Sequence, residues 1–105
     1  MAQFRIYANS NEGTKAEFPY LLEVQSELLS DLATRMVIPI VTFSNPKYRA
    51  MTKLTPAIEI KGRKYLAITP LMAGVPRSAL GNEIADLSRT QGDIIAAVDL
   101  LITGI

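Results

Sequence analysis

The chain has 105 residues, the size of one ordinary domain, and its 49% hydrophobic and 20% charged residues predict a folded core rather than disorder. The 11 basic and 10 acidic residues leave a net charge of +1. The overall charge therefore does not favour binding to nucleic acid or to an anionic membrane surface. Cysteine and histidine are both absent, which excludes disulfides, thiolate nucleophiles, the commonest metal ligands and the usual general base.

The first third of the chain predicts two strands joined by a loop. Residues 3–8 alternate between apolar and polar side chains, as in a half-buried strand. Residues 9–18 are rich in Asn, Ser and Gly and carry charges of both signs, which predicts a turn or loop. Strand character resumes over residues 20–26, and residues 27–33 fit either a short loop or one helical turn.

The middle of the chain predicts further strands. Residues 34–43 are strongly strand-like, but Pro39 lies among them, and because proline cannot donate to a ladder it predicts an edge strand or a bulge. Residues 44–56 break the pattern and predict an exposed segment. Further strands are predicted at residues 57–60 and 64–68, which form a hairpin around Gly62, and within residues 69–76 and 78–88.

One helix is predicted at the end of the chain. Ser88 and Gln91 have the spacing of a capping box, in which each side chain satisfies a backbone N–H. Gly104 fits the left-handed position just past a helix. One apolar face follows the helical period at Ile94, Ile95, Val98, Leu101 and Ile102. Short strands followed by one helix predict a mainly β protein, a strongly bent sheet or small barrel, as a single domain over residues 1–105.

The last seven residues, DLLITGI, are unusually apolar for a chain end. Chain ends are commonly frayed and polar unless something holds them. Two interpretations stay open: these side chains pack into the core of the chain, or they form a surface that another protein binds.

Motifs for catalysis and cofactors are missing from the sequence. The glycines form neither a dinucleotide fingerprint nor a P-loop, so we expect no cofactor and no metal. Glu83 with Asp86 and Glu23 with Glu27 are candidate acid pairs, for which solvated surface carboxylates are the simpler interpretation. The first residues lack a signal pattern and no apolar run approaches transmembrane length, which predicts a cytoplasmic protein without a membrane partner.

The segment 44–56 and its flank are rich in basic side chains, namely Lys47, Arg49 and Lys53 with Arg35 before them. Tyr48 and Tyr65 would be aromatic platforms if this segment bound nucleic acid. Because the net charge is close to zero, we favour a loop that contacts an acidic peptide, with apolar anchors at Phe43, Met51 and Leu54.

Several segments, in order along nearly the whole chain, together resemble the CcdB family of gyrase-poisoning toxins. The specific combination is RMVIP with an ending in Gly-Ile, while the loops at 9–18 and 44–55 match least. The matching segments are EVQSELL (23–29), TRMVIPI (34–40), GVP (74–76), GNEIADLS (81–88) and DIIAAVDLLITGI (93–105).

The resemblance implies an SH3-like barrel with a three-stranded wing and a C-terminal α-helix, forming a non-catalytic homodimer. It implies the toxin of a type II toxin–antitoxin system, which inserts between the arms of the gyrase A subunit dimer and traps the complex with cleaved DNA. A CcdA-like antitoxin would neutralise it, and operator DNA would be bound only through the antitoxin complex.

The resemblance also assigns site residues. Gyrase contacts are implied at Leu28, Leu29, Asp99, Ile102, Thr103, Gly104 and Ile105. Thr103 stands where the best-known member has a Trp that stacks on a gyrase arginine, and Asp99 replaces an amide, so we expect Asp99 to pair with an arginine instead. A disordered, acidic antitoxin segment is expected to contact the 9–18 loop and the basic residues Lys47, Arg49 and Lys53.

Two rival functions remain. The same fold serves the MazF and Kid toxins, which cut single-stranded RNA, and a ribonuclease of that kind would need Asp or Glu as its base, helped by Arg or Thr. The other rival is a dimeric interaction module whose tail only packs the dimer. RNA cleavage, trapped linear DNA, or neither would distinguish the three.

Overall fold

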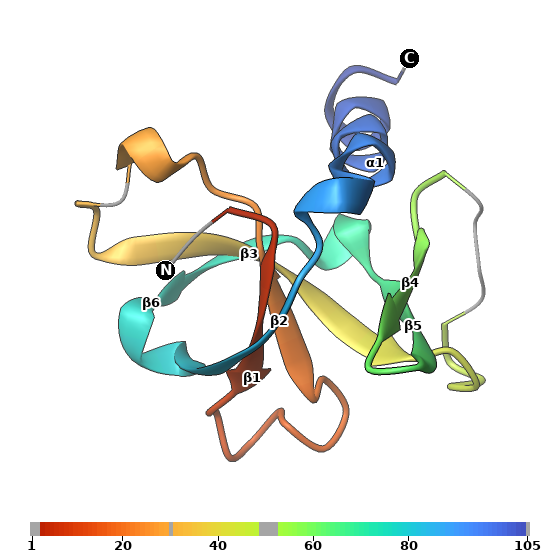
Figure 1. The fold of residues 1–105 in the computed structure, drawn as a ribbon, viewed down its shortest axis with the longest axis horizontal. Helices are drawn as coiled ribbons and strands as arrows, with labels where there is room; N and C mark the ends of the chain where they lie inside the picture. Colours follow the sequence, from red (N-terminus) through yellow and green to blue (C-terminus); the bar gives the residue numbers. More distant parts are fainter. Residues whose placement is uncertain (1–2, 30, 49–52, 105) are drawn as a thin grey trace.

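The computed structural model describes residues 3–29, 31–48 and 53–104 (Figure 1). The strands are β1 (Arg5–Asn9), β2 (Tyr20–Glu23), β3 (Thr34–Thr42), β4 (Ala57–Ile60), β5 (Arg63–Ala67), β6 (Ala73–Pro76) and β7 (Leu80–Asp86). The helix α1 (Gln91–Thr103) follows them, and four short 3₁₀ helices join strands: η1 (Glu27–Leu29), η2 (Thr69–Leu71), η3 (Arg77–Ala79) and η4 (Ser88–Thr90). None of the described helices is long and apolar enough to span a membrane.

All seven strands belong to one antiparallel sheet in the order β4-β5-β3-β2-β1-β7, with β6 paired to β3 beside β5. The sheet curls into a half-barrel, and α1 stands at one end of it (Figure 1). The hairpin of β4 and β5 pairs with the far end of β3 and makes the three-stranded wing. The mainly β fold with one C-terminal helix, expected as a CcdB-type small barrel, is therefore confirmed.

Strand β3 lies inside the sheet although Pro39 is in it, so the expected edge strand or bulge is wrong. On one side β3 pairs with β2 throughout residues 37–40. On the other side it pairs with β6 up to Val37 and with β5 from Ile40. The carbonyl of Pro39 accepts a hydrogen bond from Ile68 on this second side, so its nitrogen faces the junction between the two neighbours. The missing N–H therefore breaks no ladder bond.

The hairpin of β4 and β5 is confirmed. Lys61 and Gly62 connect the strands with φ values of 51° and 81°. Positive φ at both central residues is the requirement of a type I′ turn, whose backbone twist matches the right-handed twist of the two strands that it joins.

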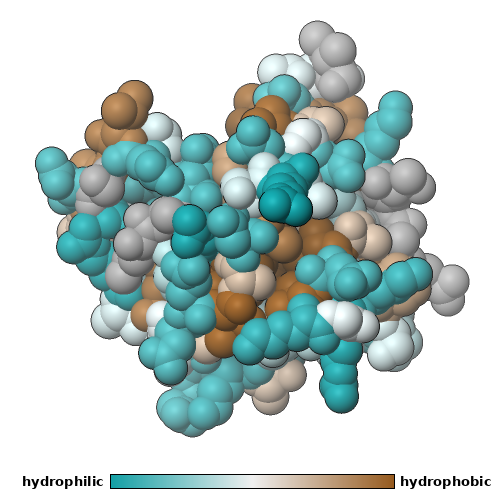
Figure 2. Space-filling view, viewed as in Figure 1, coloured by the Kyte–Doolittle hydropathy of each residue, from teal (hydrophilic) through white to brown (hydrophobic). Residues whose placement is uncertain are grey.

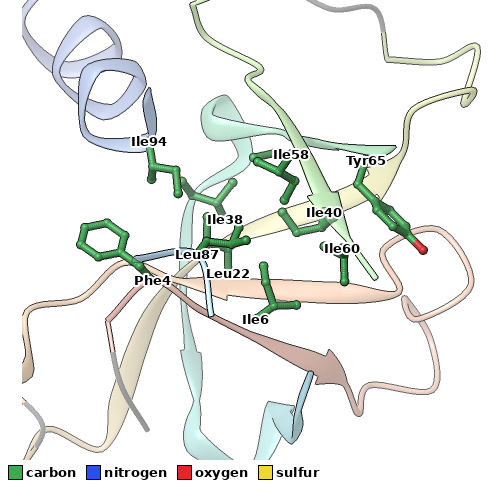
Figure 3. Close-up of a cluster of buried hydrophobic side chains, with 11 residues drawn as sticks. Phe4, Ile6, Leu22, Ile38, Ile40, Ile58, Ile60, Tyr65, Leu87 and Ile94 are labelled. Atoms are coloured by element: carbon green, nitrogen blue, oxygen red, sulfur yellow. The ribbon is translucent and has the colours of Figure 1, made fainter. Parts of the chain in front are cut away.

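The main core lies between the curled sheet and the first turns of α1. Figure 3 shows Ile6, Leu22 and Ile38 on the sheet facing Ile94 of the helix and Leu87 before it. Ile94 and Ala97 are the buried residues of α1, while the helix's other apolar side chains are partly or largely exposed. The predicted apolar face therefore docks α1 through its amino-terminal half.

The predicted capping box is wrong. The segment from Ser88 to Thr90 forms the 3₁₀ helix η4, α1 begins at Gln91, and Thr90 at its cap makes no side-chain bond to the helix. Asp86 replaces the box, because its carboxylate accepts a hydrogen bond of 2.9 Å from the N–H of Ser88. This bond lowers the pKa of Asp86.

The predicted end of the helix is confirmed. Gly104 has φ 74° and ψ 17°, and its N–H donates to the carbonyl of Leu100. A Cβ at this position would meet no neighbour within 4 Å. The left-handed backbone, rather than lack of space, is what favours glycine here.

We expect the two ends of α1 to respond differently to truncation. Ile94→Ala should cost about 2–5 kcal/mol of unfolding free energy, because it empties a fully buried site. Ile102→Ala removes an exposed side chain and should change stability by about 0.5 kcal/mol or less. Urea unfolding of both variants measures this, and equal destabilisation would show that Ile102 is packed in solution.

Candidate protein-binding site

The loop between β2 and β3 presents leucines to solvent. Leu28 in η1 is 94% exposed, and Leu29 and Leu32 are about half exposed. Figure 2 shows hydrophobic side chains projecting at the upper left, over the tip of this loop. Clustered exposed leucines on a small protein mark an interaction surface. The sequence predicts a loop or one helical turn over residues 27–33, and the structure has a turn of 3₁₀ helix at Glu27–Leu29.

Behind this loop lies a buried ion pair. Arg35 is 1% exposed and Glu23 is 3% exposed, with Nε and Oε2 separated by 3.5 Å. Arg35 also donates through Nη1 to the carbonyls of Leu32 (2.5 Å) and Thr34 (3.0 Å). Arg35 therefore belongs to the interior and not to the basic surface predicted from the sequence, and Glu23 is not a solvated carboxylate paired with Glu27.

Burial raises the pKa of Glu23, and the positive charge of Arg35 opposes that rise. Its other oxygen, Oε1, is buried without a hydrogen-bond partner among the described residues. The carboxylate is thus stabilised by Arg35 on one side and desolvated on the other.

The carboxyl-terminal turns of α1 present a second exposed apolar group. Ile102 is 70% exposed, so the interpretation that this turn packs into the core is wrong for Ile102. The Thr103 hydroxyl donates to the carbonyl of Asp99 (2.6 Å), which commits its proton to the helix. Asp99 and Thr103 are exposed, as expected, and Gly104 ends the helix beside them. Ile105 lies outside the described residues.

An apolar groove lies between α1 and the sheet. It encloses about 250 Å³. One wall is formed by residues of α1 that include Asp99, and the other by Met36 of β3 and by residues flanking β1, β2 and η2. Met36 on β3 and Ile95 on α1 border it and are more than a third exposed. Because Met36 directly follows Arg35, the groove begins at the base of the leucine-bearing loop and extends to the helix turn that carries Asp99.

The basic segment is bound to the loop between β1 and β2. Lys47 Nζ and the Tyr48 hydroxyl both donate to Glu17 Oε2, each over 3.0 Å. These bonds lower the pKa of Glu17, the Lys47 bond most, and Glu17 in turn raises the pKa of Lys47. The structure therefore joins the two loops predicted to contact an antitoxin. Lys53 is exposed, and Arg49 lies outside the described residues.

The aromatic residues near this segment are differently placed. Tyr65 is buried and meets Tyr20 edge to face with ring centroids 5.4 Å apart, so it is not a platform for bases. Phe43 is 46% exposed beneath the ammonium of Lys64, 5.7 Å from the ring centroid. Leu54 is partly buried, and Met51 lies outside the described residues. Phe43 is thus the exposed apolar anchor that the structure supports.

The other candidate acid pair is engaged by an arginine. Arg5 donates to Glu83 Oε2 over 2.8 Å and lies 3.3 Å from Asp86 Oδ2, and these contacts raise its pKa. Among the residues that the structure describes, acidic side chains form no cluster suited to a metal ion.

The profile of the CcdB protein family matches residues 3–104. The chain belongs to the CcdB family. Family membership identifies it as a toxin of the toxin–antitoxin type, with an antitoxin as partner. A solved structure described as an endoribonuclease in complex with its cognate antitoxin, from a mycobacterial species, has a TM-score of 0.76 with this chain. The similarity covers 97% of this chain and 94% of that one at 14% identity, so it shows a shared fold.

Sequence reasoning missed three features of this CcdB-family site. Leu32 extends the exposed leucines, and the spacing 28, 29, 32 was a readable signal. The Glu23–Arg35 pair joins adjacent strands and has no local signature. Gln25 bridges the base of the loop, and its position next to Ser26 in the VQS segment gave no sign of this contact.

The buried pair predicts a pH-dependent stability. Because burial raises the folded-state pKa of Glu23 above its ordinary value of 4.5, the folded protein binds this proton more tightly than the unfolded chain. The resulting stabilisation is complete below pH 4.5 and is lost as pH rises through the folded pKa. Glu23→Gln removes this loss, so the variant should gain stability relative to the parent between acid and neutral pH.

Urea unfolding of both proteins at a series of pH values gives this difference in stability. Glu23→Gln leaves the charge of Arg35 unpaired at every pH, and this constant cost shifts the difference without changing its pH dependence. A difference that stays flat across the series would show that Glu23 has an unshifted pKa in solution.

Proposed function

We propose that this CcdB-family chain poisons DNA gyrase without catalysing a reaction: it binds the gyrase A subunit and traps the complex with cleaved DNA. The observation that supports this is the exposure of both apolar groups assigned to gyrase by the family resemblance, Leu28 with Leu29 and Ile102. Such a poison acts in the cytoplasm, in agreement with the location expected from the sequence.

The exposed groups have the character of binding hot spots. Leu28 and Ile102 expose most of their side chains, so a partner would remove almost all of that apolar area from water. Asp99 lies one turn before Thr103 with no ion pair among the described contacts, so its carboxylate suits an arginine of the partner. Few such residues commonly carry most of the energy of an interface.

We further propose that two copies pair about a two-fold axis. Met36 and Ile95, on the two sides of the apolar groove, leave hydrophobic surface that a second copy would cover. Pairing across this face would bring two copies of the carboxyl-terminal turn of α1 to one side of the dimer, which suits a target that is itself a dimer.

The similar endoribonuclease fold keeps RNA cleavage as the second candidate. Arg35 with Glu23 has the residue types of an arginine-assisted general base, but both side chains are almost fully buried and RNA cannot reach them. Arg5 is reachable, yet Glu83 and Asp86 neutralise its charge and would repel phosphates. These placements favour the gyrase proposal over the ribonuclease.

The gyrase proposal is tested by truncating its contacts. Leu28→Ala and Ile102→Ala should each weaken binding to the gyrase A subunit by about 2 kcal/mol, roughly 30-fold, because hot-spot side chains cost this much when removed. Phe43→Ala is the matched control, since it truncates an exposed apolar side chain at the other end of β3. Calorimetry measures the affinities, and plasmid linearisation by gyrase measures trapped cleavage.

Unchanged affinity in both leucine and isoleucine variants would exclude this surface. Sedimentation is the control for this comparison of affinities: each variant should have the same oligomeric state as the parent protein. Cleavage of single-stranded RNA by the purified protein, with no effect on gyrase, would replace the proposal with the ribonuclease.

The antitoxin surface is tested through its charges. Lys53→Glu should slow association with an acidic antitoxin segment and reduce its salt dependence, since it reverses an exposed cation. Glu17→Gln should do the opposite and speed association, because it removes the carboxylate that neutralises Lys47. Stopped-flow association rates at several salt concentrations measure both effects. Rates that respond to neither substitution would place the antitoxin elsewhere.

A further inference from the structure

The side chain of Gln25 bridges the base of the leucine-bearing loop. Its Oε1 accepts a hydrogen bond from the backbone N–H of Met36 on β3, over 3.0 Å. Its Nε2 donates to the carbonyl of Leu29 at the end of η1, over 2.9 Å. The amide thus uses its acceptor toward the sheet and its donor toward the exposed turn, which neither an ionised carboxylate nor an apolar side chain of this size can do.

The turn has little else to hold it. No residue of η1 is buried, so apolar packing does not fix Leu28 or Leu29. The other hydrogen bonds given for the turn are local: the N–H of Leu28 donates to Ser26 Oγ, the N–H of Leu29 donates to the Ser26 carbonyl, and the N–H of Leu32 donates to the Leu29 carbonyl. These bonds shape the turn but do not attach it to β3.

Arg35 holds the other limb of the same loop. It donates to the carbonyls of Leu32 and Thr34, after the turn, while its charge is held by Glu23. Gln25 therefore holds the limb that carries Leu28, and Arg35 holds the limb that returns to β3.

We propose that Gln25 is a positioning residue for partner binding: it holds η1 against β3 so that Leu28 and Leu29 are ordered before the partner arrives. This inference rests on the proposed function, because it concerns the same leucines. A turn already held in its binding arrangement loses less conformational entropy on association than one that must be ordered. Gln25 itself is not required to touch the partner.

Two substitutions at Gln25 separate its hydrogen bonds. Gln25→Met keeps the length of the side chain and removes both bonds, and should weaken binding to the gyrase A subunit about tenfold. Gln25→Glu keeps the acceptor for Met36 and removes the donor to Leu29, and should fall between the parent and Gln25→Met. Gln91→Met, at the exposed start of α1, is the matched control and should leave the affinity unchanged.

A double-mutant cycle distinguishes positioning from general support of the fold. In a chain that carries Leu28→Ala and Leu29→Ala, adding Gln25→Met should cause no further loss of gyrase affinity, because the side chains that Gln25 positions are gone. Thermal unfolding and antitoxin affinity should be the same for Gln25→Met and Gln91→Met.

The outcomes are separable. If the two leucine substitutions leave gyrase affinity intact, the proposed function fails at this site and the inference fails with it. If they weaken binding but Gln25→Met is without effect, or its effect is the same with and without the leucines, the proposed function stands and the positioning role of Gln25 is overturned.

Discussion

The hydrogen bonding of β3 along both of its edges is the constraint on which the other features depend. This nine-residue strand pairs with β2 on one side and with β6 and β5 on the other, and so holds the main sheet and the wing together. The loop with Leu28 enters at its first residue, and the basic segment with Lys47 leaves from its last. Nine residues span on the order of 27 Å, so one rigid strand separates the two proposed binding surfaces. An antitoxin that binds the basic segment must therefore be long or extended to reach the leucines of the same chain.

The amino-terminal end of β3 combines buried charge with exposed apolar side chains. Arg35 is in the interior with Glu23, and its neighbour Met36 is on the surface, because alternate residues of a strand face opposite sides. A buried ion pair costs desolvation that its attraction barely offsets, so stability alone does not explain it. Its hydrogen bonds to Leu32 and Thr34 do explain a structural use, since they hold a loop whose own side chains point outward.

Patterns that depend on neighbouring residues could be read from the sequence, and those that depend on distant strands could not. The turn at Lys61 and Gly62 and the helix end at Gly104 follow from local backbone preferences. The prediction of an edge strand or bulge at Pro39 is wrong because the proline lies where the partner of β3 changes from β6 to β5. No local sequence pattern encodes that change of partner. The cap at Ser88 failed because Asp86, two residues earlier, already binds its N–H.

The candidate site divides along the same line. Leu28 and Ile102 are assigned by the resemblance and are exposed. Glu23 and Arg35 are predicted on the surface from the sequence, but both are buried and form an ion pair with each other. Thr103 adds a limit on the chemistry of the helix end: with its proton committed to Asp99, its hydroxyl can only accept a hydrogen bond. It therefore cannot replace the energy of a Trp stacked on an arginine. Under the proposed function, binding then relies more on the apolar area that Leu28, Leu29 and Ile102 would remove from water, and for the two leucines on how firmly η1 is held.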